Sequence, residues 1–332
     1  MPFVVDTDVF VCYNVDKLIW QRSLFMELMK IYANLHLHST HSDGGYSPTE
    51  LVHVAKDEGY KALAITDHDT ATAYPELARE AQKAGMEYII GAEFAVFKPK
   101  PFHIASFGFD PEYPEMKKYL ADMAHRITEN TRLCFEENVQ KGYFKGITWG
   151  EVLEYNKSIA WLCNNHVFRA MLAKGLVEEK NYMSWFYAYF EKQRGHYPSK
   201  IEFLPLNELV SLVKKAGGVS LVAHPHGQLD DIDMLVENGV EGLEVLNDLN
   251  DDEKVRALKI ALERDLYVGG GSDHYGLCSG FYSGFPSEEE LKKDPCYIPP
   301  LSTGTSYEFF HEIKDRKLNR EYREKLKKEL GM

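Results

Sequence analysis

The chain has 332 residues, of which 44% are apolar, and its 38 basic and 51 acidic side chains give a formal charge of −13 at pH 7. This composition indicates one or two ordinary soluble domains. The acidic balance argues against binding of extended nucleic acid, because such binding needs a basic surface that displaces phosphate counterions. A small anionic substrate is compatible with this charge if cations lie in the site.

The sequence also excludes several other classes of protein. No stretch approaches the roughly 18 uninterrupted apolar residues that a membrane helix needs, and Asp6 and Asp8 stand where a signal peptide would carry basic residues. We therefore expect no membrane association and a cytoplasmic location. The cysteines are odd in number and include no C-x-x-C pair, which argues against a disulfide framework or a Cys-ligated zinc module. They are Cys12, Cys134, Cys163, Cys278 and Cys296.

From residue 33 onward the chain alternates between strand and helix patterns, after an N-terminal extension (1–32) without recognisable chemistry. The capping box Ser47-Pro48-Thr49-Glu50 predicts a helix that ends at Gly59, and a second helix is predicted from about Pro75 to Gly85. Short segments rich in apolar, β-branched and aromatic residues predict strands. These segments are 33–37, 62–65, 88–90, 103–109, 219–222, 242–246 and 266–268.

Seven strands that mostly alternate with helices indicate an α/β protein, either a parallel barrel or a doubly wound sheet. The interval 111–204 breaks this rhythm with helical stripes, which predicts an inserted helical subdomain between barrel segments 33–110 and 205–284. The tail, 285–332, begins with a loop-rich stretch. From about Phe309 it has a helical pattern, which fits a docked or solvated terminal helix or a contact with a partner.

Histidine and carboxylate residues recur at the ends of the predicted strands. His36 and His38 end the first strand, and side chains two apart on a strand point the same way. Taken alone, this pair is no more specific than two ordinary surface histidines. In barrels, the site collects at the carboxyl ends of the strands. Further residues of these types near strand ends are Asp43, His68, Glu93, His103, His224, His226, Asp273 and His274.

Each of these residues has an ordinary structural alternative. His68 could cap a helix, Glu93 could be a charge at the rim, and His224 could be a hydrogen-bonded core histidine. Their concentration at strand ends favours a shared site instead. Imidazole and carboxylate without thiolate are the ligands that suit Zn, Mn or Fe. Two such ions about 3.5–4 Å apart can clamp the attacking and leaving oxygens of a phosphate ester.

In order, these motifs resemble those of the polymerase and histidinol phosphatase (PHP) superfamily. The resemblance covers about residues 33–276, and within the superfamily the chain is similar to stand-alone phosphoesterases that include the nucleoside 3',5'-bisphosphate phosphatases. The inserted segment contributes His166-Val167-Phe168-Arg169-Ala170, an H-x-x-R-A pattern similar to that group. The other matching segments are His36-x-His38 with Asp43, Thr66-Asp67-His68, Gly91-x-Glu93, His103, Ala223-His224-Pro225 and Gly271-Ser272-Asp273.

The resemblance implies a distorted seven-stranded (β/α) barrel that binds two or three divalent ions of Mn, Zn or Fe. It also implies that His166 and Arg169 face the substrate phosphate, where a guanidinium suits bidentate binding. The implied ligands are His36, His38, Glu93 and Asp273 for one ion, Asp43, His68 and His224 for a second, and Glu93, His103 and a histidine beside Asp273 for a third.

One departure from the family pattern affects the third ion. The family usually has S-D-x-H, whereas here His274 follows Asp273 directly and Tyr275 takes the usual histidine position. We expect His274 to complete the third site from a bent loop, since nearby glycines such as Gly271 and Gly276 tolerate unusual backbone angles. The alternative is a two-metal enzyme with Tyr275 near the substrate.

The sequence therefore predicts a metal-dependent phosphoesterase that acts on a phosphomonoester of a small molecule, such as a nucleoside 3',5'-bisphosphate. A water activated by the cations would attack phosphorus, Arg169 would neutralise charge on the phosphate oxygens, and His226 could protonate the leaving group. Alternatives are hydrolysis of histidinol phosphate, exonucleolytic trimming of short RNA, and a catalytically silent module that binds metal or nucleotide. The sequence does not indicate an oligomeric state.

Overall fold

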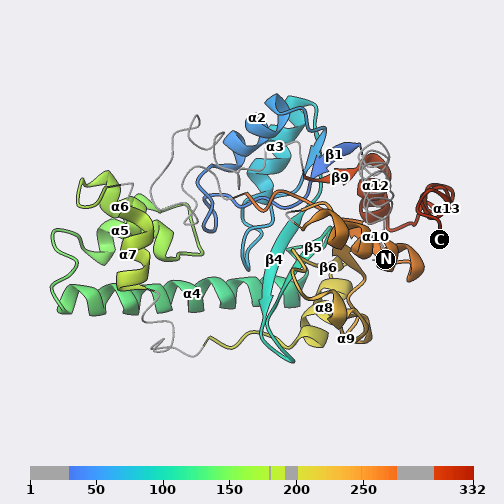
Figure 1. Cartoon of the computed structure of the whole chain (residues 1–332). Coiled ribbons are helices and arrows are strands. Elements are labelled where there is room, and N and C mark those ends of the chain that lie inside the picture. The colour runs from blue at the N-terminus through green and yellow to red at the C-terminus, as the bar shows by residue number, and fades with distance from the viewer. Residues whose placement is uncertain (1–29, 179–180, 191–200, 248, 275–302) are drawn as a thin grey trace, which may run out of the picture.

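The structure is a computed structural model that describes residues 30–178, 181–190, 201–247, 249–274 and 303–332 (Figure 1). Most of the predicted N-terminal extension, Tyr275, Gly276 and the loop-rich start of the tail lie outside the described residues. Helices surround two mixed β-sheets, which confirms the predicted α/β class.

The strands of the described residues form one sheet of four strands and one of five. In the first sheet, β1 pairs in parallel with β2 and antiparallel with β9, and β3 adds in parallel to β2. In the second, β4, β5 and β6 are antiparallel neighbours, and β7 and β8 continue in parallel. The bounds are β1 Ile31–Asn34, β2 Ala62–Leu63, β3 Glu87–Tyr88, β4 Gly91–Val96, β5 Phe102–Phe107, β6 Val219–Val222, β7 Gly242–Glu244, β8 Tyr267–Gly269 and β9 Thr305–Ser306.

Each of the seven predicted strands overlaps an observed strand, and β4 and β9 are additional. Backbone hydrogen bonds beyond the named strands join the two sheets at both margins. The N–H of Leu35 donates to the Gly270 carbonyl at 3.1 Å, and the N–H of Asp69 donates to the Glu93 carbonyl at 2.9 Å. The strands nevertheless pair as two separate mixed sheets. A closed seven-stranded barrel therefore stays a prediction.

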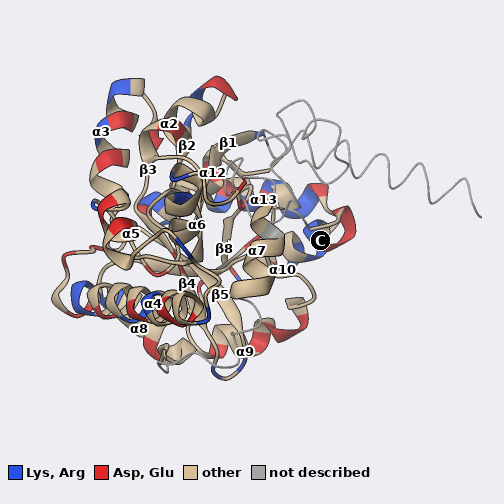
Figure 2. Ribbon diagram, turned by 90° about the vertical axis from the view of Figure 1, so that its left-hand side faces the viewer, with Lys and Arg blue, Asp and Glu red and all other residues tan. Residues whose placement is uncertain are grey.

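Two of the helices, α2 and α3, begin and end close to where the local sequence predicts. The capping box of Ser47 and Glu50 is formed at the start of α2, and Gly85, with φ of 69°, ends α3. Figure 2 shows charged residues along the helices α2, α3, α4, α8 and α13, with few on the central strands. The helices are α2 Pro48–Asp57, α3 Tyr74–Ala84, α8 Leu206–Lys215, the 3-10 helix η3 Leu229–Asp231, α9 Ile232–Glu237 and α10 Asp251–Glu263.

The interval 111–204 is helical, as predicted, in the part that the structure describes. It contains α4 Pro114–Gln140, α5 Trp149–Tyr155, α6 Asn164–Ala173 and α7 Tyr182–Tyr189, with the three short helices gathered at one end of α4 (Figure 1). These helices bury an aromatic cluster of their own, which includes Phe135, Phe144, Phe168 and Trp185. The division of the chain into domains stays a prediction.

The tail forms two helices, α12 Tyr307–Asp315 and α13 Arg320–Glu329, where one helical stretch was expected. The chain turns at Arg316, whose φ is 56°. Glu312 and Arg323 join the two helices through a buried ion pair at 2.5 Å, each side chain 1% exposed. Phe309 of α12 and Leu326 of α13 lie in one buried cluster with Phe94 of β4, so the tail is docked onto the sheets. Within the described residues, none of the helices combines the length and the apolar character that crossing a bilayer requires.

A hydrophobic layer between the sheets positions the strand ends. Ala33 and Ala62 of the four-stranded sheet lie in one cluster with Phe107 and Leu221 of the five-stranded sheet, and Phe310 of α12 joins them. All five side chains are buried completely. Close packing of this kind leaves little freedom to the segments that leave the strands.

Candidate metal centre

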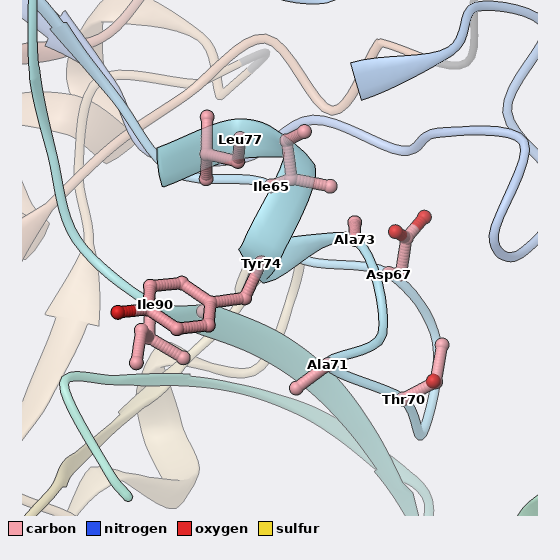
Figure 3. Close-up of a pocket in the computed structure, with 9 residues that line it drawn as sticks. Ile65, Asp67, Thr70, Ala71, Ala73, Tyr74, Leu77 and Ile90 are labelled. Atoms are coloured by element: carbon pink, nitrogen blue, oxygen red, sulfur yellow. The ribbon is translucent and has the colours of Figure 1, made fainter. Parts of the chain in front are cut away.

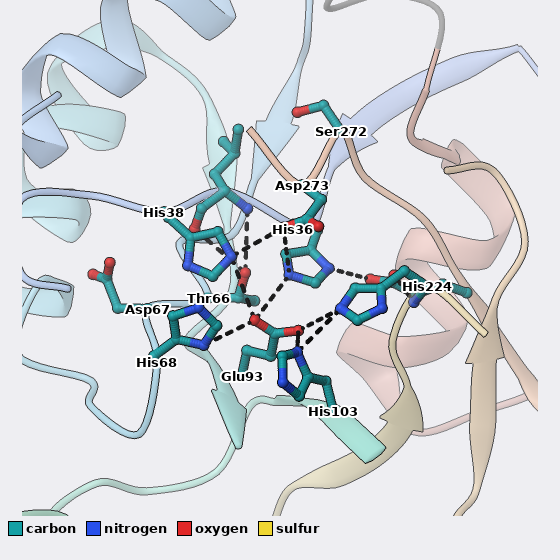
Figure 4. A network of polar contacts seen from close by, with 12 residues as sticks. His36, His38, Thr66, Asp67, His68, Glu93, His103, His224, Ser272 and Asp273 are labelled. Atoms are coloured by element: carbon teal, nitrogen blue, oxygen red, sulfur yellow. Dashed lines mark hydrogen bonds and ion pairs between the residues drawn. The ribbon is translucent and has the colours of Figure 1, made fainter. Parts of the chain in front are cut away.

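Histidines and carboxylates from both sheets converge at one end of the strands (Figure 4). His36 and His38 follow β1 with side chains on the same face, and their ring centroids lie 5.2 Å apart. Both side chains have no exposed surface. His103 lies at the start of β5 rather than at an end, but β5 runs antiparallel to β4 and β6. Its start therefore meets the carboxyl end of β6.

Glu93, in β4, lies at the middle of this cluster and is completely buried. Its carboxylate contacts five imidazoles, so one side chain joins segments that follow or begin four different strands, β1, β2, β5 and β6. Glu93 Oε2 lies 3.5 Å from His36 Nε2, 3.4 Å from His38 Nε2 and 3.1 Å from His68 Nδ1, and Oε1 lies 3.0 Å from His103 Nδ1 and 2.9 Å from His224 Nε2.

Among the described residues, three groups of side chains have ligand atoms within 4.8 Å of one another. The first has the same four members as the first expected ligand set. The other two differ from expectation, because His224 lies with His103 and not with Asp43 and His68. The cause is strand order: β5 and β6 are neighbours, with Ile104 opposite Val222. The groups are His36, His38, Glu93 and Asp273; His38, Asp43 and His68; and Glu93, His103 and His224.

His274 is not a member of any of the three groups, and its expected role in a third site stays a prediction. The chain does turn there, but the turn is at Asp273 itself, whose φ is 50°. This turn brings Asp273 Oδ1 to 3.1 Å from His38 Nε2 and directs the His274 ring against Tyr46, with centroids 6.4 Å apart. The third group is made instead of Glu93, His103 and His224.

The protonation of these residues is strongly coupled to their neighbours. Burial opposes the charged form of the His36 imidazole, but the Glu244 and Glu93 carboxylates outweigh it and raise the pKa of His36 well above the ordinary value. Burial also opposes the charged form of the His224 imidazole, but the Glu93 carboxylate outweighs this effect and raises the pKa of His224 to about 9. Burial likewise opposes the carboxylate form of Asp273, yet the histidines lower its pKa to about 2.

The donor atoms fit a divalent cation. His36 Nε2 and Glu93 Oε2 are buried and have no hydrogen-bond partner among the described residues, although they face each other at 3.5 Å. Buried polar atoms are almost always hydrogen-bonded, so such a pair indicates a place for a charged ligand between them. Nitrogen and carboxylate oxygen are donors that Zn, Mn and Fe ions accept.

Glu244, at the end of β7, is a site residue that the sequence reasoning missed. It is completely buried; its Oε1 lies 2.8 Å from His36 Nδ1 and its Oε2 accepts the N–H of His224 at 2.8 Å. A carboxylate on Nδ1 leaves Nε2 of His36 for a metal and fixes the ring. Its position in the sequence could have indicated it, since 242–246 was a predicted strand for which no candidate site residue was named.

His166 and Arg169, which are expected to face the substrate phosphate, contact the protein backbone in this structure. His166 is buried, with Nε2 3.1 Å from the Thr40 carbonyl oxygen and Nδ1 accepting the Cys163 N–H at 3.0 Å. Burial, helped by Arg169, lowers the pKa of His166 to about 3, so the ring is neutral. Arg169 donates to the Gly44 carbonyl. These contacts favour a role in holding residues 40–44.

His226, the expected proton donor, is exposed, and its ring centroid lies 6.3 Å from that of His224. A separate pocket lies behind the segment 65–74 and is lined mainly by apolar side chains such as Ile65, Leu77 and Ile90 (Figure 3). Asp67 reaches it, but none of the clustered histidines does. This pocket is therefore separate from the cluster of histidines in Figure 4.

We predict that Glu244→Gln weakens metal binding about 10- to 100-fold, because the amide cannot hold His36 and the His224 N–H as the carboxylate does. Titration of metal-free protein with Mn²⁺ measures the change. The matched control is Glu241→Gln, three residues earlier, since Glu241 pairs with Lys214 at 3.5 Å on the surface. Equal metal affinity in both variants would contradict the role of Glu244.

We also predict that metal binding releases protons near neutral pH. Without metal, His224 keeps its proton up to about pH 9, so a cation must displace it at pH 7. Apparent affinity should rise about tenfold per pH unit for each displaced proton and level off above pH 9. Calorimetry in buffers of different ionisation enthalpy counts these protons. A count of zero between pH 7 and 8 would reject this account.

The chain was compared with known protein families and sequences. The model of the PHP domain matches residues 34–197. A 5'-3' exoribonuclease from Haemophilus influenzae is 31% identical over 196 residues, which is 58% of this chain and 68% of that protein. A phosphoribosyl 1,2-cyclic phosphate 1,2-diphosphodiesterase from Eggerthella lenta is 26% identical over 73% of this chain and 94% of that protein. A 3',5'-nucleoside bisphosphate phosphatase from Chromobacterium violaceum is 27% identical over 74% and 88%.

The fold also matches a solved structure. A Bifidobacterium adolescentis protein, assigned to the metal-dependent phosphoesterases, superposes with a TM-score of 0.66 at 24% identity and covers 87% of this chain and 98% of its own. The family match covers the strands and loops that supply four of the clustered histidines, His36, His38, His68 and His103. The chain therefore belongs to the PHP domain family and is a metal-dependent phosphoric ester hydrolase.

Proposed function

We propose that this enzyme hydrolyses a phosphomonoester of a small molecule, with nucleoside 3',5'-bisphosphates as the substrate class. The observation that supports it best is the single buried carboxylate of Glu93 shared among histidines of both sheets. Such an arrangement can hold cations close together, which is what cleavage of a phosphate ester uses. The relative from Chromobacterium violaceum carries the same activity in its name.

The residues present could hold two or three divalent ions of Mn, Zn or Fe. When bound, such cations supply Lewis acidity to the phosphate oxygens and make water a nucleophile at neutral pH. We assign His36, His38, Glu93 and Asp273 to the first ion and Asp43 and His68 to the second. Glu93, His103 and His224 would hold a third.

The other residues hold and charge this centre. Glu244 fixes the ring of His36 and the backbone of His224. Arg169 is the proposed cation for the substrate phosphate, through guanidinium N–H groups other than the one given to Gly44. We propose that His226, exposed beside His224, returns a proton to the leaving alkoxide.

The fold supports the same proposal. Hydrogen bonds between Leu35 and Gly270 and between Asp69 and Glu93 join the sheets on both sides of the centre, which favours a barrel-like closure beneath it. The helical interval 111–204 would act as an inserted subdomain beside this opening. The formal charge of −13 favours small phosphorylated substrates over extended nucleic acid.

A substrate screen tests the proposed class. With added Mn²⁺, we expect nucleoside 3',5'-bisphosphates to be hydrolysed with kcat/KM at least tenfold above histidinol phosphate, a five-membered cyclic phosphodiester and short 5'-phosphorylated RNA. EDTA should abolish all turnover, because the proposed reaction requires the bound cations. Preference for the RNA or for the cyclic ester would replace the bisphosphate assignment, and metal-independent turnover would reject the centre.

We predict that His68→Ala lowers phosphoesterase activity at least a hundredfold while the protein still unfolds cooperatively. His68 contacts Glu93 and Asp43 at the site and is 17% exposed, so its loss leaves no deep cavity. Elemental analysis should show two or three equivalents of metal in the wild type and fewer in the variant. His125→Ala, an exposed histidine on α4, is the control. Normal turnover in His68→Ala would return this residue to a structural role.

A further inference from the structure

The loop that carries Asp43 differs from the other segments of the metal centre. Asp43 lies in a turn between β1 and α2, and two histidines of its group face its carboxylate: Oδ1 is 3.6 Å from His38 Nδ1 and Oδ2 is 3.6 Å from His68 Nε2. The backbone is tightly folded, because a Cβ at Gly44 would lie 2.0 Å from the His38 carbonyl oxygen. Within the loop the N–H of Gly44 donates to the Ser39 carbonyl at 2.9 Å, and further contacts come from outside the loop.

One side of the loop is held by Asp67, at the end of β2. This buried carboxylate accepts the N–H of Ser39 at 2.7 Å, the Ser39 hydroxyl at 2.6 Å and the Ser42 hydroxyl at 2.6 Å. These contacts fix the start of the loop to the sheet. They do not reach the backbone of Asp43 and Gly44.

The other side of the loop is held by α6 of the helical interval. Asn165 Nδ2 donates to the Asp43 carbonyl oxygen at 2.7 Å, and Arg169 donates to the Gly44 carbonyl. His166 Nε2 adds a contact of 3.1 Å with the Thr40 carbonyl oxygen. One helix thus satisfies three carbonyls of a segment more than 120 residues away in the sequence.

Neighbouring residues fix the donors of α6 in these orientations. The side chain of Asn165 is buried, and its Oδ1 accepts Asn164 Nδ2 at 3.1 Å. Asn164 Nδ2 also donates to the hydroxyl of Tyr182 at 2.7 Å. Nδ1 of His166 accepts the N–H of Cys163, so the proton of the neutral His166 ring is on Nε2 and is donated to the Thr40 carbonyl. A hydrogen-bonded chain therefore runs from Tyr182 of α7 to the backbone of Asp43.

We infer that α6 clamps the loop of residues 39–44 and that Asn165 is a positioning residue for the Asp43 ligand. Asn165 touches the backbone of Asp43 and not its carboxylate, so it acts through the loop. The helical interval then takes part in retaining the ion assigned to Asp43 and His68. This inference rests on the proposed function, since it requires cations at the centre.

Metal titration of Asn165→Ala tests the clamp. We expect Mn²⁺ binding to metal-free protein, followed by calorimetry, to weaken about 10- to 100-fold at one site and to stay at the wild-type value at the others. At saturating Mn²⁺, kcat should recover while KM for substrate stays within about threefold. A role confined to folding would lower the melting temperature without this selective loss.

The matched control is Asn138→Ala. Asn138, in α4, is also a buried amide of the helical interval, and its Nδ2 donates to the carbonyls of Cys134 and Tyr189. We expect this variant to lose stability and to keep wild-type metal affinity at every site. If Asn165→Ala does not fold, Asn165→Ser and Asn165→Gln test the same contact, and the longer amide should restore part of the affinity.

The outcomes separate this inference from the proposed function. A wild-type protein that binds no metal overturns both. A wild type that binds metal, with Asn165→Ala of equal affinity at every site, overturns the clamp and leaves the phosphoesterase proposal intact. Equal weakening in Asn165→Ala and Asn138→Ala overturns it too, because the effect would then be a general loss of packing in the helical interval.

Discussion

The metal centre depends on the burial of one carboxylate, Glu93, among imidazoles from both sheets. An ionised carboxylate without compensation costs roughly several kcal/mol to bury. Here the histidines lower the pKa of Glu93 well below its ordinary value against the effect of burial. The same contacts join the two sheets, because Glu93 in β4 meets His36 after β1 and His68 after β2. The centre and the fold therefore stabilise each other.

Strand direction decides which residues meet. A purely parallel arrangement would place His103, at the start of its strand, at the opposite end from His224. Because β5 is antiparallel to both β4 and β6, the two rings are instead 5.1 Å apart. Residue order along the chain does not reveal this, so the sequence predicted the first group but not that His224 lies with His103.

Much of the fold could be predicted because its signals are local. All seven predicted strands were found, and the capping box before α2 formed as expected. β4 was missed because Gly91 and a buried Glu93 are atypical of a strand interior, and they gain their place from tertiary contacts. Glu244 was missed for a related reason. Its carboxylate is functional only through His36, which lies 208 residues away in the sequence.

The contacts of α6 show why the H-x-x-R-A pattern was hard to interpret from sequence. A histidine and an arginine beside a phosphate site suggest phosphate binding, yet His166 gives both ring nitrogens to the backbone and Arg169 reaches Gly44. Ligands that leave a strand are fixed by the sheet beneath them, whereas a ligand in a turn needs support from another element. Asp43 lies in such a turn. This explains why α6 carries polar side chains, such as Asn165, that hydrogen-bond to the backbone of the loop.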